Sequence, residues 1–173
     1  MLRISKLTDY AVVLTTHLAQ QWAQQRAQQG AQQGAQQGVD GVEARSAHHM
    51  RDLAAETGIP QPTVSKVLKL LTREGLLESQ RGVNGGYRLA RPPARINIAE
   101  VITAVEGPIG VTECTSDSGC CEYEARCEVR GNWQRINEAV YGALAAISLA
   151  EMTKPGSVLV HLTRKDSDNA NAQ

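Results

Sequence analysis

Apolar positions near the start of the chain recur every three or four residues. This stripe predicts an amphipathic helix with Ser5 as its cap, and its members are Leu7, Tyr10, Ala11, Leu14, Leu18 and Trp22. A tetrapeptide beginning Ala-Gln-Gln then repeats five times within residues 19–38, and its last three copies end in glycine. Because each glycine costs about 1 kcal/mol in a helix relative to alanine, we expect the helix to fray near Gly30. Residues 26–44 are expected to form a disordered insertion.

Two shorter helical patterns follow, separated by Gly58. The second begins near Gln61 and Pro62, and its apolar stripe consists of Val64, Val67, Leu68 and Leu71. Two short helices joined by a glycine-containing turn are typical of the helix-turn-helix unit, although any pair of packed surface helices gives a similar pattern. The polar positions outside the stripe are the expected DNA contacts: Gln61, Thr63, Ser65, Lys66 and Lys69.

Two strand-like runs surround a glycine-rich turn in "LLESQRGVNGGYRLA", residues 76–90, which predicts a β-hairpin. A hairpin directly after a recognition helix is a wing. Arg81 near the tip and Arg88 on the return strand are expected to contact DNA phosphates or a minor groove. The alternative is a solvated turn that merely tolerates charge.

A last apolar stripe predicts a long helix over residues 132–153, with Asn132 as its cap. Its members are Trp133, Ile136, Val140, Leu144 and Ile147. A small winged domain cannot cover this stripe, so we expect the helix to pair with its copy in a two-fold dimer. Two recognition helices would then lie about one DNA turn, roughly 34 Å, apart. The polar residues 163–173 are expected to be disordered.

Charge is segregated along the chain although the formal net charge is zero. Nine Lys and Arg face five Asp and Glu between Glu43 and Ile98, whereas residues 99–163 contain four and nine. This asymmetry favours a nucleic-acid-facing segment joined to a part with another role. No apolar run approaches the roughly 20 residues that span a bilayer, so we expect a cytoplasmic protein without a membrane partner.

All four cysteines lie within "ECTSDSGCCEYEARC", residues 113–127. Thiols stay reduced in the cytoplasm, which disfavours disulfides. Five residues separate Cys114 from Cys120 and Cys121 from Cys127, whereas zinc sites favour pairs with two to four. Iron–sulfur clusters usually take four thiolates. The residues alone leave zinc and a cluster open; His48 and His49 are further ligands by element type only.

No enzyme is indicated. Ser, His and Asp form no catalytic motif, and the glycines of "RGVNGGY" follow no phosphate-binding strand-to-helix pattern.

Five segments carry a resemblance to a known family: "SKLTDYAVVL", "LAAETGIPQPTVSKVLKLL", "GLLESQRGVNGGYRLARPP", "INIAEVITAVEGPIGVTEC" and "RGNWQRINEAV". Together they resemble the IscR/NsrR-type winged-helix iron–sulfur regulators, and among these most the proteobacterial regulators of the SUF assembly operon. The likeness runs from Met1 to about Met152, apart from the glycine-rich insertion.

The resemblance implies a mostly α-helical fold with a small β wing, a homodimer, a palindromic double-stranded DNA operator and an iron–sulfur cluster with two or four irons. It supplies three cysteine ligands, assigned to Cys114, Cys121 and Cys127 with Cys120 as the alternative to Cys121. Family members with a histidine ligand carry it where this chain has Arg130. Others take a carboxylate from the first helix of the partner subunit, which corresponds here to Asp9, although an acid there also simply favours the helix dipole.

We therefore expect a winged helix-turn-helix domain over residues 1–98, a helix and cluster loop over 99–131 and a dimerisation helix over 132–153. The expected function is a cluster-sensing repressor of SUF-type assembly genes. The alternatives are a nitric-oxide or redox sensor on the same scaffold, and a cluster carrier that does not bind DNA.

Overall fold

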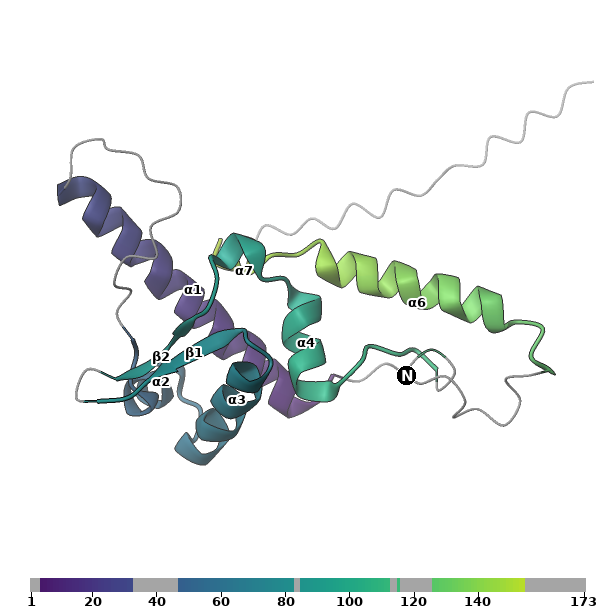
Figure 1. The fold of residues 1–173 in the computed structure, drawn as a ribbon, viewed down its shortest axis with the longest axis horizontal. Coiled ribbons are helices and arrows are strands. Elements are labelled where there is room, and N and C mark those ends of the chain that lie inside the picture. The colour runs from purple at the N-terminus through teal and green to yellow at the C-terminus, as the bar shows by residue number, and fades with distance from the viewer. Residues whose placement is uncertain (1–3, 33–46, 83–84, 113–114, 116–125, 155–173) are drawn as a thin grey trace, which may run out of the picture.

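The computed structural model describes residues 4–32, 47–82, 85–112, 115 and 126–154. Helices dominate, and one small antiparallel sheet accompanies them (Figure 1). The elements are α1 (Lys6–Gln32), α2 (Met50–Thr57), α3 (Gln61–Arg73), β1 (Leu77–Gln80), β2 (Gly86–Leu89), the 3₁₀ helix η1 (Pro93–Arg95), α4 (Ile98–Glu106), α6 (Arg130–Ala145) and α7 (Leu149–Met152). The expectation of a mostly α fold with a small β wing is confirmed.

Helix α1 runs along the centre of the fold and contacts α2, α3, α4, α7 and β2. Its stripe enters the core as expected, since Ala11, Leu14 and Leu18 are at most 2% exposed. The Ser5 hydroxyl accepts the Thr8 N–H at 3.3 Å, which confirms Ser5 as the cap. The helix continues to Gln32, two residues past the expected end, so the first part of the predicted insertion is helical. Residues 33–46 lie outside the described ranges.

Two local features form the helix-turn-helix unit: the apolar stripe of α3, which is buried, and the turn glycine, which ends α2. Val64, Val67, Leu68 and Leu71 are all 0% exposed, which confirms the stripe of α3. Gly58 ends α2 with φ of +68°, a left-handed conformation that side chains rarely adopt. Because the apolar stripe of α3 is buried, the polar face of the helix points outward.

The wing is the hairpin β1–β2, with Leu77 opposite Leu89 and Glu78 opposite Arg88. The buried Leu77 and Leu89 anchor its base in the core. Ahead of α2, His48 pairs with Tyr87 through two backbone hydrogen bonds of 2.9 Å. A segment distant in sequence thus attaches to the two-stranded wing through a single-residue β-bridge.

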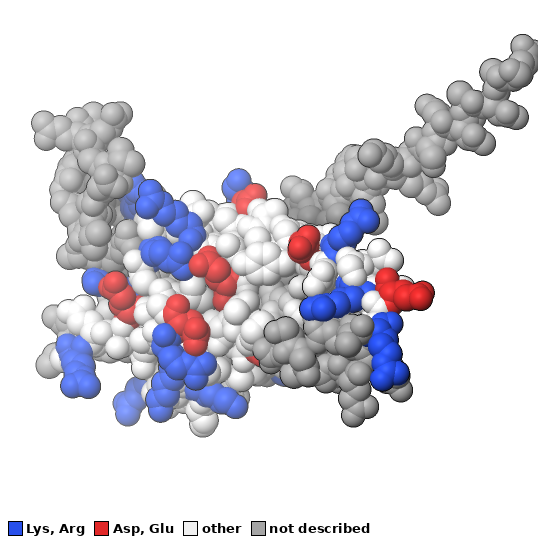
Figure 2. Space-filling model, turned by 45° about the vertical axis from the view of Figure 1, so that its right-hand side comes forward, with Lys and Arg blue, Asp and Glu red and all other residues white. Residues whose placement is uncertain are grey.

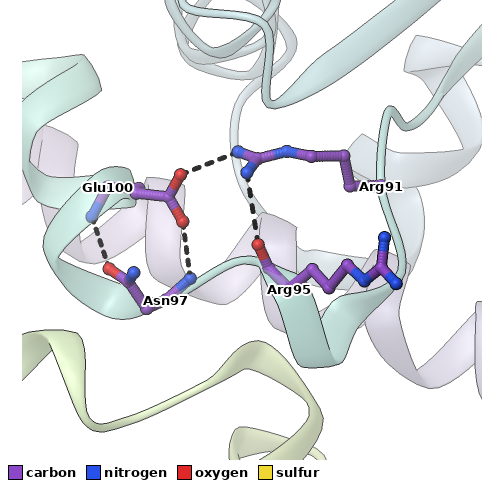
Figure 3. A network of polar contacts seen from close by, with 4 residues as sticks. All are labelled: Arg91, Arg95, Asn97 and Glu100. Atoms are coloured by element: carbon purple, nitrogen blue, oxygen red, sulfur yellow. Dashed lines mark hydrogen bonds and ion pairs between the residues drawn. The ribbon is translucent and has the colours of Figure 1, made fainter.

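The C-terminal half is joined to the winged unit at the start of α4. The Ile98 N–H donates to the Ile147 carbonyl, and the Leu149 N–H donates to the Ile96 carbonyl, both at 2.9 Å. Asn97 and Glu100 form a capping box on α4. Arg91, two residues past β2, reaches this box and donates to Glu100 Oε1 at 2.8 Å (Figure 3).

The long helix expected over residues 132–153 is in fact two helices. Helix α6 begins at Arg130 rather than after Asn132, and it ends at Ala145. Helix α7 starts afresh with Ser148 as its cap. The physical reason is the backbone pairing of Ile147 and Leu149 with the residues around Asn97, because it takes amide and carbonyl groups that a continuous helix needs.

None of the helices within the described ranges is both long and apolar enough to cross a bilayer. The expected disordered tail, residues 163–173, lies outside the described part of the chain.

Candidate nucleic-acid interface and metal centre

The polar face of α3 lies on the surface as the sequence predicted. Gln61, Lys66 and Lys69 are exposed, and Thr63 and Ser65 are half-buried. Neither lysine forms an ion pair with any described residue. Pro62 lies in the first turn of α3, where its missing N–H is tolerated. The helix therefore offers free cations and hydroxyl groups to a ligand along one face.

The two wing arginines differ in their surroundings. Arg81 is exposed and has no acidic partner among the described residues. Arg88 instead donates from Nε and Nη2 to Glu78 Oε2, at 2.9 and 2.8 Å. Lys and Arg side chains gather along the lower left edge of the molecule in Figure 2, the side on which Figure 1 places α3 and the wing. This edge is the candidate nucleic-acid interface.

Sequence reasoning missed the role of His48. It treated this residue as a ligand by element type only, whereas in the structure its backbone forms an isolated β-bridge with Tyr87. Burial lowers the pKa of the His48 imidazole, with Glu56 and Asp52 opposing the shift and His17 adding to it. His17 Nε2 lies 2.6 Å from Glu56 Oε2, which ties α1 to α2. The bridge involves a single residue of this segment, so the alternating pattern typical of a strand does not appear in the sequence.

Asp9 lies at the first turn of α1, on an open groove of about 480 Å³. Apolar side chains from the residues just before α1, from α1, α4 and the end of α6 line this groove, namely Ile4, Val12, Ile98, Ile102 and Leu144. The Asp9 side chain is 56% exposed, and its described partner is Lys6 Nζ at 3.4 Å. The carboxylate therefore remains available to a group that enters the groove.

Glu106, the last residue of α4, holds the N-terminus of α1. Its Oε1 accepts the Ser5 N–H at 3.0 Å and also the Thr8 hydroxyl. Hydrogen bonds from the Ser5 and Thr8 hydroxyls and from the Ser5 backbone hold the pKa of Glu106 below its usual value. The turn that carries Asp9 is thus attached to the end of α4, from which the chain leaves toward the cysteines. The sequence carried no signal for this contact.

Of the four cysteines, Cys127 lies within the described ranges. It is half-buried, it has a free thiol, and it precedes α6 by three residues. Cys114, Cys120 and Cys121 lie outside those ranges. The described residues bring no three His, Cys, Asp or Glu side chains together as a metal site. The predicted ligand set is therefore neither assembled nor contradicted within the described part of a single chain.

The buried helix-turn-helix, the attached wing and the basic edge define a winged helix-turn-helix protein. Residues 41–155 match the Rrf2 family, described as iron-dependent transcriptional regulators. Because the match spans more than half of the chain, this protein belongs to the Rrf2 family.

Individual relatives support the assignment to this family. The chain is 35% identical over 119 residues to the HTH-type transcriptional regulator IscR of Xenorhabdus nematophila, covering 69% of this chain and 72% of that one. It is 32% identical over 123 residues to IscR of Photorhabdus laumondii, covering 71% and 74%. The relatives are transcription regulators, so the chain is a DNA-binding regulator of the IscR/NsrR type rather than an enzyme. These relatives support the IscR/NsrR type, but they do not support the narrower SUF-specific subgroup.

Solved structures share the fold. The cysteine regulator CymR of B. subtilis superposes with a TM-score of 0.59 at 24% identity, covering 88% of this chain and 97% of that one. IscR of T. potens superposes with a TM-score of 0.57 at 22% identity, covering 87% and 85%.

Proposed function

We propose that this protein is a homodimeric repressor that binds a palindromic operator and responds to an iron–sulfur cluster, with SUF-type assembly genes as its targets. The observation that carries DNA binding is the exposed face of α3 beside the wing. There Lys66, Lys69 and Arg81 are free of ion pairs with described residues. Free cations are the groups that neutralise phosphates, whereas Gln61, Thr63 and Ser65 carry the hydrogen-bonding groups that read base edges.

Dimerisation is supported by the surface of α6. No residue of this sixteen-residue helix is buried within the chain. Ile136 and Tyr141 are 44% and 46% exposed, and Val129 just ahead of the helix is 49% exposed. Large apolar groups gathered on one element mark an interaction surface. A second copy of α6 would cover this surface and would set two recognition helices on one operator.

The cluster proposal rests on the chemistry of the donors. Four thiols within fifteen residues suit an iron–sulfur cluster, and the available Cys127 thiol stands at one end of this stretch. We assign Cys114, Cys121 and Cys127 as ligands, with Asp9 of the partner subunit as the fourth. The exposed carboxylate of Asp9 in its groove and the Glu106 contact beneath its turn support this choice. A bound cluster would supply a centre that reacts with oxidants and nitric oxide.

The chain's own residues then explain a response. Asp9 lies in the first turn of α1, and α1 packs against the recognition helix α3 in the core. A ligand that holds the first turn of α1 therefore biases the position of the recognition helix. Two arrangements biased by one ligand are what a switch requires.

One experiment tests this function. The protein is purified anaerobically, its bound iron and sulfide are measured, and its affinity for a palindromic promoter fragment is compared before and after cluster removal. We expect Cys114→Ala, Cys121→Ala and Cys127→Ala to lose the cluster, Cys120→Ala to keep a native spectrum, and Asp9→Ala to alter the cluster or the response. Cluster loss in Cys120→Ala would favour all-cysteine ligation, and a normal response in Asp9→Ala would remove the link between subunits.

A nitric-oxide or redox sensor on the same scaffold is the second candidate, because the same cysteine stretch suits it. Exposure of the loaded protein to nitric oxide, with operator affinity as the readout, separates the two. A cluster carrier without DNA binding is disfavoured by the free cations of α3 and the wing.

A further inference from the structure

Glu78 is an acidic residue of the wing that forms an ion pair with Arg88. Arg88 is therefore not one of the free cations of the candidate interface. Glu78 and Arg88 are opposite each other in the hairpin. Two donors of the Arg88 guanidinium converge on a single oxygen, Glu78 Oε2, at 2.9 and 2.8 Å. The side chain of Arg88 is 28% exposed and that of Glu78 is 51% exposed, so the carboxylate is the outer member of the pair.

We infer that Glu78 is a specificity-determining residue, which lowers the affinity of the wing for DNA of any sequence by neutralising Arg88 and by repelling phosphates. The inference rests on the proposed DNA surface. Charge-assisted contacts of this kind are held in place by geometry as well as by charge. An exposed ion pair contributes little to stability, so its placement on the strand that leads to Arg81 is better explained by an effect on the ligand.

The reason for an effect on specificity is that the two binding modes use charge differently. Non-specific binding is supplied almost entirely by cations that neutralise phosphates, and any free cation near the backbone contributes to it. In the operator complex, base contacts supply the sequence specificity, and phosphate contacts fix the position of the protein on the duplex. A freed Arg88 gains there only if a phosphate lies within its reach. Releasing Arg88 is therefore expected to strengthen binding to non-specific DNA more than binding to the operator.

The expected size follows from counterion release. One additional phosphate contact steepens the log–log salt dependence by about 0.9, which corresponds to about eightfold in affinity at roughly 0.1 M salt. Glu78→Gln should approach this value on a scrambled duplex, because the amide keeps the shape of the side chain and removes its charge. Arg88→Gln should weaken binding, because it leaves the Glu78 carboxylate unneutralised.

The test measures fluorescence anisotropy of full-length protein with a palindromic promoter fragment and a scrambled duplex of equal length, across a series of KCl concentrations. We expect Glu78→Gln to bind the scrambled duplex more tightly with a steeper salt slope, and the ratio of operator to scrambled affinity to fall. The double variant Glu78→Gln/Arg88→Gln should return to within about twofold of wild type, because the charges cancel as a unit.

Glu74→Gln is the matched control. Glu74 holds Arg73 at 2.9 Å at the end of α3, so the variant changes net charge identically at another place. Because Glu74→Gln also releases an arginine, an equal effect in this variant would show that Glu78 has no particular role, and unchanged scrambled affinity in Glu78→Gln would overturn the inference directly. If the wild-type protein bound neither duplex, the proposed function itself would fail. If it bound both and the variant did not differ, the failure would belong to Glu78 alone.

Discussion

Replacing Gly86 with alanine should detach the wing from His48, the residue ahead of α2 that bridges to it. Gly86 opens β2 with φ of +155°, a conformation that side chains rarely adopt. A Cβ there would lie 2.4 Å from the His48 carbonyl oxygen and 2.6 Å from its carbon. Because these contacts are with backbone, a side-chain rotation cannot relieve them. The hairpin must move away from His48.

The magnitude has two parts. The strained φ costs about 1–3 kcal/mol. Separation also removes both 2.9 Å hydrogen bonds between His48 and Tyr87, and each contributes about 1 kcal/mol. Gly82 provides the control, because it also has a positive φ, +112°, but no atom of the described residues lies within 4 Å of its Cβ position. The two variants should therefore differ by about 2 kcal/mol, which is about 4–8 °C in Tm for a chain of this size.

Thermal unfolding and operator anisotropy on the two variants provide the assay. We expect Gly86→Ala to melt below Gly82→Ala and to bind the operator more weakly, because a detached wing no longer presents Arg81 beside α3. Equal melting temperatures and equal affinities in the two variants would refute the reasoning, since the clash with His48 would then have no consequence.

Three further outcomes are expected. Lys66→Ala and Arg81→Ala should each weaken operator binding and flatten its log–log salt slope by about 0.9, as measured by anisotropy, because each removes one phosphate contact; unchanged slopes in both would contradict the proposed interface. Ile136→Asp should yield a monomer in sedimentation experiments, because it places a charge on the apolar face of α6, and a stable dimer would show that another surface mediates assembly. Glu106→Gln should lower the melting temperature near neutral pH. Since the folded-state pKa of Glu106 lies below its ordinary unfolded-state value, the stabilisation from its carboxylate is complete above the unfolded-state pKa and is lost as the pH falls through the folded-state pKa. The difference in melting temperature between Glu106→Gln and wild type should therefore vanish in acid. A difference that persists in acid would show that the Glu106 charge is not the cause of the destabilisation.

Local patterns in the sequence determined the helices of the winged unit and the polar face of α3. The stripe of Val64, Val67, Leu68 and Leu71 and the turn at Gly58 act over three to eight residues, and burial of that stripe leaves Lys66 and Lys69 outside by geometry alone. The cap at Ser5 was predictable for the same reason. The clustering of all four cysteines identified the cysteine stretch, whereas resemblance to a family assigned its ligands and pointed to Asp9.

Contacts between residues distant in sequence decided the rest. Only the folded chain shows that His48 bridges to the wing, that Glu106 holds the N-terminus of a helix about a hundred residues earlier, and that Ile147 and Leu149 divide the expected long helix by pairing beside Asn97. Each of these uses a backbone group or a single polar side chain, which leaves no period in the sequence. Arg88 is the clearest case: its charge was visible from the start, but whether that charge is free depended on the register that places Glu78 opposite it. A one-residue shift of the hairpin would turn the two side chains to opposite faces.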